Sequence, residues 1–540
     1  MGDNALNAPV HQQFIHQLNQ KTISPVTLRK KTTMQHFSKG DPAMRIKLTP
    51  SWTILLTIFL LNTACRSLDQ PKNHSGKIKN YTDAITTTSL QTMESNAAFS
   101  IEGLPRPVTF TLGDMTTKDY DAMIAITKHN ERKEVPLLSG FSRDIQLLPP
   151  LSLLNVRPDP SVNDKEIMLA KLDVPGAEMF RVQINFLEFP ADSEVYLTSP
   201  TKNNLIRWSH SEAHLEWSPI IFGDSILLAI RSSKKIDKLN ITGVLQIFPL
   251  TANGNIVKGG KAFIKGRWES LAAVSGTRPL VDSTCKTDEN TRYRTSPNFV
   301  RQIESATGLL ATVTSLDNVF TVSGFCTGTR VASLSDPQGY YILTANHCYS
   351  SGNPPQTNAT NADLATTQVF WDYRTTTCNA SGPIQFSSAE LMSLPQSVGA
   401  TLLGARFESD AVLFRTTPAP GTRVALGWQL GLQLTNDAFV HRVSHPNAYS
   451  TGYSLQLIDH IETLTYCESL GTPRAEYFNS SLLEGETSPG SSGSSVVTQN
   501  LRVVGQLYGS CKWSKNGHTW TTDVDGELSR SWPAFGRFLE

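Results

Sequence analysis

The chain has 540 residues, with 48 lysines and arginines against 47 aspartates and glutamates, and its formal net charge at pH 7 is +1. This balance provides no excess of basic residues for nucleic-acid binding and no acidic tail. Hydrophobic residues make up 39% of the chain, which suffices for ordinary globular cores and excludes wholesale disorder. A single core rarely grows beyond ~250–300 residues, so about two to four domains are expected.

The first feature along the chain is a short apolar run at Trp52–Leu61. A bilayer span needs ~20 residues, so this run is too short to cross a membrane but is typical of a signal-peptide core. Met44 and a positively charged flank precede the run. We therefore expect a signal peptide at 44–65 and a protein that is secreted or carried to the periplasm or cell surface. Residues 1–43 are either an over-extension upstream of the true start or a cytoplasmic leader.

The chain has seven cysteines, of which Cys65 follows two small residues at the end of the predicted signal peptide. This position resembles a bacterial lipoprotein acceptor, although Asn62 stands where leucine is usual, so we expect membrane association only if Cys65 is lipidated. The other cysteines all lie in the C-terminal half and none forms a CxxC pair. This distribution indicates an oxidising compartment with up to three disulfides, and we expect no metal and no cofactor. They are Cys285, Cys326, Cys348, Cys378, Cys467 and Cys511.

Residues 66–100 are rich in Ser, Thr, Asn and Lys and are expected to be a linker. From about residue 101 to 250, short β-like runs such as Met179–Phe189 and Ser218–Ile230 alternate with Gly, Pro, Asp and Asn. Runs of this length separated by turn residues predict a β-sandwich-like domain. This region has no cysteine and no grouping of His, Asp and Ser that would make a site.

Residues 251–284 carry several basic residues among glycines and are expected to be exposed and open to cleavage. We therefore divide the exported chain into a linker and β-rich pro-domain at 66–279 and a second domain at 280–540. The second domain again shows β-like runs, including Phe320–Ala332 and Arg502–Gly509.

Three segments of the second domain carry residues suited to nucleophilic catalysis. Tyr340–Cys348 reads YYILTANHC, Glu486–Val497 reads ETSPGSSGSSVV, and Asp410 lies between them at the entrance of an apolar strand. The order His, Asp, Ser is one of the three convergent orders known for catalytic triads.

These segments, together with GFCTGTRV, FWDYRTTTC, SHPN and RVVGQLYG, make residues 285–540 resemble a bacterial trypsin-like serine protease, most closely a lysyl endopeptidase. The matching features are spread over most of that span. The resemblance implies an all-β fold, with a chymotrypsin-like double β-barrel protease domain after the β-sandwich-like pro-region.

The resemblance also implies a role for each residue of the triad. His347 would accept the proton of the Ser492 hydroxyl, and Asp410 would hold the imidazole in the required tautomer. The amides of Gly490 and Ser492 would form the oxyanion hole. Asp410 combines a turn with a following buried strand. Other aspartates of the interval are Asp363, Asp372, Asp437 and Asp459.

In lysyl endopeptidases an aspartate at the base of the primary pocket selects lysine, and the resemblance assigns this role to Asp523. Asp523 and Asp525 would share one face of a strand, so spacing alone does not separate them. Tyr508 and Tyr466 are expected beside the pocket, where the family has a histidine and a tryptophan. Arginine therefore remains an alternative to lysine.

The resemblance further implies two disulfides and leaves a third pair. The expected bridges are Cys326–Cys348 at the histidine loop, Cys285–Cys511 between the mature N-terminus and the pocket region, and Cys378–Cys467.

We thus expect a secreted serine endopeptidase that cuts proteins or peptides after lysine and acts as a monomer. A glutamyl endopeptidase also has a G-x-S-G-S turn, but a pocket carboxylate would repel glutamate. The alternative from another class is a non-catalytic surface-binding lipoprotein with a protease-like fold. In trypsin an aspartate before the nucleophile pairs with the freed N-terminal amine, and here Ser491 takes that position. Residues 66–279 would then keep the precursor silent.

Overall fold

The computed structural model describes Ile85–Ser89 and most of the chain from residue 107 to its end, with gaps. The predicted signal peptide, Cys65, Tyr466 and Cys467 lie outside the described residues. None of the described helices combines the length and the apolar character that a membrane span requires. The longest described stretches are 107–131, 166–185, 215–234, 298–316, 319–350, 357–430, 438–460, 476–515 and 518–540.

The N-terminal region is a β-sandwich, as predicted. One layer is the sheet β2 (Val108–Thr111), β6 (Glu166–Asp173), β12 (Ser225–Ser232), β8 (Glu194–Thr198) and β9 (Leu205–Trp208), with β5 (Val156–Pro158) beside β6. The other contains β10 (Leu215–Trp217), β7 (Met179–Asn185), β14 (Ile241–Ile247) and β3 (Leu137–Ser142), with β11 (Ile221–Phe222) beside β7.

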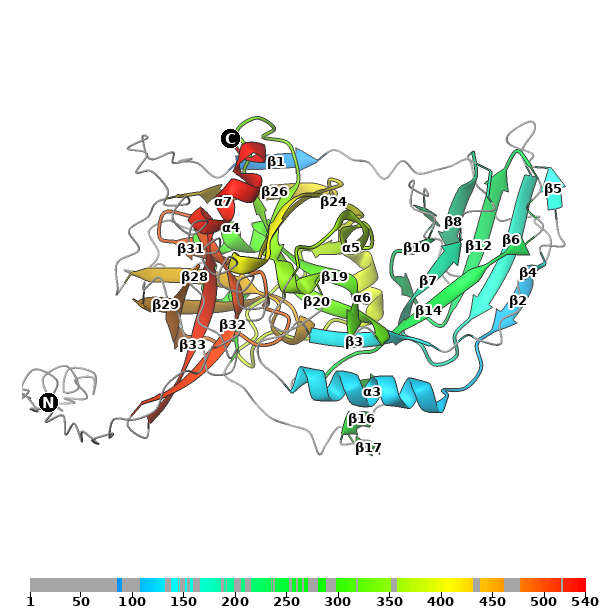
Figure 1. Cartoon of the computed structure of the whole chain (residues 1–540), viewed down its shortest axis with the longest axis horizontal. Helices are drawn as coiled ribbons and strands as arrows, with labels where there is room; N and C mark the ends of the chain where they lie inside the picture. The colour runs from blue at the N-terminus through cyan, green and yellow to red at the C-terminus, as the bar shows by residue number, and fades with distance from the viewer. Residues whose placement is uncertain are drawn as a thin grey trace, which may run out of the picture. The chain divides into compact units, whose positions relative to one another are not determined.

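The two layers enclose one apolar core. Alternate residues of β6, such as Met168 and Leu172, and of β7, such as Phe180 and Val182, are fully buried in the same cluster. This period-two burial is what places one face of each sheet against the other. A helix that the sequence did not predict, α3 (Thr117–Asn130), lies along β3 and begins at a capping box on Thr116 (Figure 1).

The sandwich continues by hydrogen bonding into the C-terminal domain. The free edge of β3 pairs with β20 (Phe320–Val331), with Leu137 opposite Phe325 and Phe141 opposite Val322. The fully buried Arg181 of β7 donates to the carbonyl oxygens of Thr366 at 2.6 Å and Ala311 at 3.2 Å. The two regions therefore share a 12-stranded sheet and a hydrophobic core.

Two expectations about the connecting segments need correction. Ile85–Ser89, expected in a linker, forms β1 and pairs with β26 (Gly421–Ala425). Residues 251–284 were expected to be exposed, but this segment contains a small sheet. In this sheet Phe263 is buried against Trp268, although Lys261 is exposed. The strands of this sheet have two to four residues each, which is too short a run for the sequence to indicate a strand. This sheet is β15 (Val257–Lys258), β16 (Lys261–Ile264) and β17 (Arg267–Ser270).

The first half of the C-terminal domain is a barrel. Its strands pair in the order β24 (Ala400–Arg406), β25 (Ala411–Thr416), β21 (Tyr341–Ala345), β20, β19 (Thr307–Leu316), β22 (Gln368–Trp371) and β23 (Gln396–Val398). Because only Gly399 separates β23 from β24, the two ends of this ladder meet.

The second half is a closed six-stranded barrel. Its strands pair in the order β29 (Gly452–His460), β28 (Phe439–Ser444), β31 (Ser495–Thr498), β32 (Arg502–Lys515), β33 (His518–Glu527) and β30 (Tyr477–Glu484), and β30 pairs back with β29. The predicted all-β, chymotrypsin-like double barrel is thus confirmed (Figure 1).

Shorter elements complete the fold. They are β4 (Leu151–Ser152), β13 (Lys238–Leu239), β18 (Val281–Asp282), β27 (Gly427–Trp428), α4 (Phe299–Ala306), α5 (Asn361–Ala365), α6 (Ser388–Ser393), α7 (Leu528–Phe535), η2 (Ser283–Lys286), η3 (Asn346–Cys348), η4 (Phe407–Ser409), η5 (Pro446–Ala448) and η6 (Gly536–Phe538).

Two disulfides join described cysteines. Cys326 of β20 is bonded to Cys348, the residue after His347, as predicted. Cys285 is bonded to Cys378, with Cα atoms 4.4 Å apart. The predicted Cys285–Cys511 and Cys378–Cys467 bridges are therefore wrong.

The position of Asp282 gives the physical reason for the Cys285–Cys378 bridge. Its buried carboxylate accepts hydrogen bonds from the Thr375 hydroxyl at 2.7 Å and from the Asn379 amide at 2.8 Å. These bonds hold the segment before Cys285 against the loop that contains Cys378. Cys511 is also disulfide-bonded.

The Cys285–Cys378 bridge is expected to contribute strongly to stability because it closes a separation of 93 residues. Replacing both cysteines by alanine should lower the free energy of unfolding by about 2–4 kcal/mol, as measured by denaturant unfolding of the uncut chain. Replacing Cys326 and Cys348, which are 22 residues apart, should cost less through chain entropy. A non-reducing peptide map that links Cys285 to Cys511 would contradict this assignment.

Candidate active site

The register of two strands brings His347 and Asp410 together. Ala345 at the end of β21 pairs with Ala411 at the start of β25 in an antiparallel ladder. Residues that follow β21 therefore meet residues that precede β25. The Asn346 amide donates to the Asp410 carbonyl at 2.9 Å and fixes this junction.

The Asp410 carboxylate makes two hydrogen bonds to His347. Its Oδ2 lies 2.7 Å from Nδ1 of the imidazole, and its Oδ1 accepts the His347 backbone amide at 2.8 Å. Asp410 is completely buried and has a left-handed backbone with φ of 54°, a conformation that aspartate tolerates better than most residues. The carboxylate is thus aligned with the ring and binds the Nδ1–H tautomer.

Ser492 lies in the turn that leads into β31. Gly490 and Gly493 of this turn have φ values of +96° and +82°, which glycine adopts without a Cβ penalty. The Ser492 carbonyl accepts from the amide of Thr327 in β20 at 2.8 Å, and the Gly490 carbonyl accepts from the Thr327 hydroxyl at 2.8 Å. The carbonyl of Thr327 in turn accepts from the hydroxyl of Thr344 in β21. Thr327 therefore docks the turn on the first barrel, beside the end of β21 and so close to His347.

The amides of the turn differ in their partners. Those of Ser491, Gly493 and Ser494 donate to backbone carbonyls at 2.8 to 3.0 Å. Those of Gly490 and Ser492 have no acceptor within the described part of the chain. Two such amides in one sharp turn are free to bind an oxyanion.

The second ring nitrogen of His347 is also unpaired. Nε2 is buried and has no hydrogen-bond partner among the described residues. No hydrogen bond joins the Ser492 hydroxyl to this nitrogen among the described residues, and the transfer of the Ser492 proton to His347 stays a prediction. Tyr508, expected beside the pocket, packs edge-on against the imidazole with ring centroids 5.3 Å apart.

A second histidine near the turn is a poor candidate for the base. His445 is stacked on Tyr373 with ring centroids 5.4 Å apart, and its Nδ1 lies 2.9 Å from the carbonyl oxygen of Tyr449. Burial lowers the pKa of His445 to about 4. It is therefore a neutral, structural residue at physiological pH.

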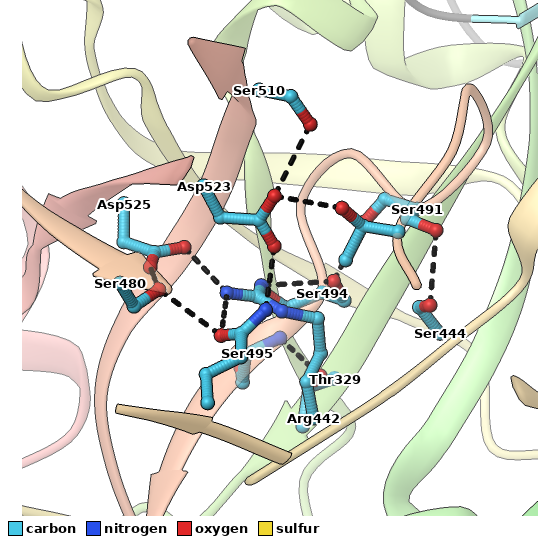
Figure 2. A network of polar contacts seen from close by, with 12 residues as sticks. Thr329, Arg442, Ser444, Ser480, Ser491, Ser494, Ser495, Ser510, Asp523 and Asp525 are labelled. Carbon is cyan, nitrogen blue, oxygen red and sulfur yellow. Dashed lines mark hydrogen bonds and ion pairs between the residues drawn. The ribbon is translucent and has the colours of Figure 1, made fainter. Parts of the chain in front are cut away.

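Asp523 and Asp525 lie on the same face of β33, and both are fully buried. Asp523 accepts hydrogen bonds from Gln456 at 2.5 Å, Thr487 at 2.8 Å and Ser510 at 3.1 Å. Asp525 instead forms an ion pair with Arg442 at 2.5 Å (Figure 2). Spacing could not distinguish the two aspartates, whereas their hydrogen-bond partners do, since the donors to Asp523 among the described residues are neutral.

The electrostatic state of Asp523 follows from these surroundings. Burial raises its pKa to about 6, because Arg442 offsets the loss of solvation only in part and the Asp525 charge adds to the increase. The carboxylate is therefore poised to ionise fully when a cation enters its site.

Residues 281–523 match the family model described as the lysyl endopeptidase C-terminal domain. This segment is a lysyl endopeptidase-like protease domain. The match begins at β18 and includes both barrels as far as Asp523. The trypsin-like class that the sequence resembled is consistent with this family.

The other aspartates considered for the triad have different positions in the lysyl endopeptidase-like domain. Asp363 caps the N-terminus of α5 through a capping box with Thr360. Asp372 forms an ion pair with Arg423 at 2.9 Å. Asp437 and the side chain of Asp459 lie outside the described residues.

The sequence did not identify Thr327, Arg442 or Gln456 as site residues. Thr327 directly follows Cys326, a cysteine expected at the histidine loop, and this position was the available signal for a role near the site. Arg442 is a charged residue in the strand segment VHRV, between two valines that indicate burial, and this was a second signal. The side chains of three residues lie close enough together to suggest a metal site, namely Cys326, His347 and Cys348. Both sulfurs are bonded to each other in a disulfide, so they are not available as metal ligands.

Gly493 is expected to be essential for the turn. A Cβ at this position would clash with the Thr344 hydroxyl and lie 2.6 Å from the Ala345 amide nitrogen and the Thr327 carbonyl oxygen. Gly493→Ala should therefore lower the free energy of unfolding by about 2–5 kcal/mol, measured by denaturant unfolding.

The matched control is Gly223→Ala. Gly223 also has a positive φ, of 112°, but a Cβ there meets nothing within 4 Å. Only the conformational cost of about 1–2 kcal/mol should appear. Equal losses for the two variants would show that the turn is not closely packed on the first barrel.

Proposed function

We propose that the protein is a secreted serine endopeptidase that hydrolyses peptide bonds after lysine, with His347, Asp410 and Ser492 as its catalytic triad. The observation that carries this proposal is the 2.7 Å contact between His347 Nδ1 and the buried Asp410 carboxylate. The unpaired Nε2 of the same ring supports it, because a general base needs one nitrogen held and the other available.

In this mechanism the Ser492 hydroxyl oxygen attacks the carbonyl carbon of the scissile bond while its proton passes to His347 Nε2. Asp410 holds the Nδ1–H tautomer and stabilises the imidazolium that forms. The amides of Gly490 and Ser492 bind the oxyanion, and each such donor contributes about 2.7–4 kcal/mol of transition-state stabilisation. His347 then gives the proton to the leaving amine, and water attacks the acyl-enzyme by the same steps.

The bonding of Asp523 favours lysine over arginine. Two hydroxyl groups, from Thr487 and Ser510, donate to Oδ1, and the Gln456 amide donates to Oδ2. Each carboxylate oxygen accepts about two hydrogen bonds, so with respect to the described donors Oδ2 keeps one place and Oδ1 keeps none. A compact ammonium needs one acceptor, whereas a guanidinium fork is best bound by two. A glutamate side chain would meet a buried carboxylate and be repelled.

The remaining parts of the chain receive roles on the same proposal. Residues 44–65 would direct export, and 66–279 would be the linker and pro-region. Ser491 supports silencing by that region, because its hydroxyl lies 3.0 Å from that of Ser444 and offers no charge to a new N-terminal amine. Protein or peptide chains are the substrates, and the enzyme would act as a monomer without a cofactor.

Covalent labelling tests the triad directly. A fluorophosphonate probe should label the wild-type protein and fail to label Ser492→Ala, while Asp410→Asn should lower kcat about 10⁴-fold because the ring loses its tautomer. Ser495→Ala is the matched control, since its buried hydroxyl has no hydrogen-bond partner among the described residues. Labelling that persists in Ser492→Ala would overturn the assignment of the nucleophile.

The pH dependence of selectivity tests Asp523. The ratio of kcat/KM for a lysine substrate to that for its norleucine analogue should rise as the pH increases through about 6, because Asp523 is protonated below this value. Titration of the catalytic base affects both substrates and cancels in the ratio. Asp523→Asn should lower the ratio about 10²–10³-fold and make it independent of pH. A ratio that is constant from pH 4.5 to 8 in the wild type would exclude Asp523 as the lysine-binding group.

A further inference from the structure

The pocket and the nucleophile turn share one buried cation. Arg442 of β28 is completely buried and lies between the two sites (Figure 2). A buried guanidinium is costly unless it is paired and hydrogen-bonded, so its contacts indicate what it holds in place.

On one side Arg442 binds the nucleophile turn. Its Nη1 donates to the carbonyl oxygen of Ser494 at 2.8 Å and to the Ser494 hydroxyl at 3.1 Å. The Ser494 hydroxyl donates in turn to the Ser491 carbonyl at 2.6 Å. The residues on both sides of Ser492 are therefore tied to the same guanidinium.

On the other side Arg442 binds the floor of the pocket. Its Nη2 lies 2.5 Å from Asp525 Oδ1 and 3.2 Å from the Gln456 side-chain oxygen. Gln456 uses its amide nitrogen to donate to Asp523 Oδ2 at 2.5 Å. Because Arg442 fixes the oxygen of this amide, it also fixes which end of Gln456 faces Asp523.

The charges of this cluster sum to −1. Asp523 and Asp525 contribute two carboxylates from β33, and Arg442 contributes one cation from β28. The neighbouring strands β29, β30 and β32 contribute the neutral side chains Gln456, Ser480 and Ser510. A single substrate ammonium would neutralise the cluster, whereas two unpaired carboxylates would share a proton.

We propose that Arg442 is a positioning residue that sets the charge of the lysine pocket and orders the nucleophile turn. This inference rests on the proposed function of Asp523 and Ser492. Trypsin obtains an ordering charge from an N-terminal amine, and this chain carries the ordering cation within its own barrel, at a position that no cleavage has to create. Arg442 does not touch the reacting atoms and acts through Asp525, Gln456 and Ser494.

The test measures the lysine-to-norleucine ratio of kcat/KM against pH. Arg442→Met should lower the ratio at pH 7 at least tenfold and move its midpoint to higher pH, because Asp525 loses its counter-charge. Asp525→Asn should move the midpoint to lower pH, because Arg442 then faces Asp523 without a competing acid. The double variant Arg442→Met/Asp525→Asn should return the midpoint towards that of the wild type.

A second measurement separates the two roles of Arg442. The rate of fluorophosphonate labelling should fall in Arg442→Met and should not recover in the double variant, because neither protein donates to Ser494. If Arg442→Met does not fold, Asp525→Asn and Arg442→Lys still test the proposal, since Arg442→Lys keeps the charge and should keep the midpoint. A wild-type midpoint in folded Arg442→Met or in folded Asp525→Asn would overturn the proposal. If the proposed function itself fails, the lysine-to-norleucine ratio of the wild-type enzyme would not change with pH, and Asp523→Asn would not lower this ratio.

Discussion

The buried contact between the His347 imidazole and the Asp410 carboxylate is the interaction on which the rest of the catalytic domain depends. It exists because β21 and β25 pair in one register, and a shift of one residue would turn Asp410 to the other face of the sheet. The Cys326–Cys348 bridge and the Thr327 contacts then fix the neighbouring segments on the same barrel. The second barrel contributes the serine turn and the buried Asp523, so the candidate site lies where the two barrels meet.

Short sequence motifs were sufficient to predict candidate residues whose local structure depends on their neighbours in the sequence. His347, Asp410 and Ser492 each stand at a strand end marked by small residues or glycine, and the structure places the first two in direct contact. The alternating runs likewise predicted most strands of both regions. The Cys285–Cys378 bridge could not be predicted, because Asp282 determines it through contacts with a loop distant in sequence. Arg442 was not predicted for the same reason, because its hydrogen-bond partners come from other segments of the chain.

Burial of charge is arranged differently in the two regions of the chain. Arg181 of the sandwich has carbonyl oxygens as its partners, and burial lowers its pKa to about 9. Arg442 forms an ion pair with the carboxylate of Asp525. The nearby carboxylate of Asp523 is not part of this ion pair. The first arrangement joins two structural regions, whereas the second pairs one buried cation with one of two buried carboxylates. Buried arginines thus serve both regions, but through partners of different charge.

The strand β3 also protects the domain that it joins. Val322–Phe325 of β20 would present bare N–H and C=O groups if β3 departed, together with apolar side chains from the common core. An uncovered strand of this kind invites addition of a strand from another molecule and leads to aggregates. Loss of the N-terminal region is therefore expected to promote aggregation. The solubility of the protease domain then depends on whether a strand still pairs with the edge of β20.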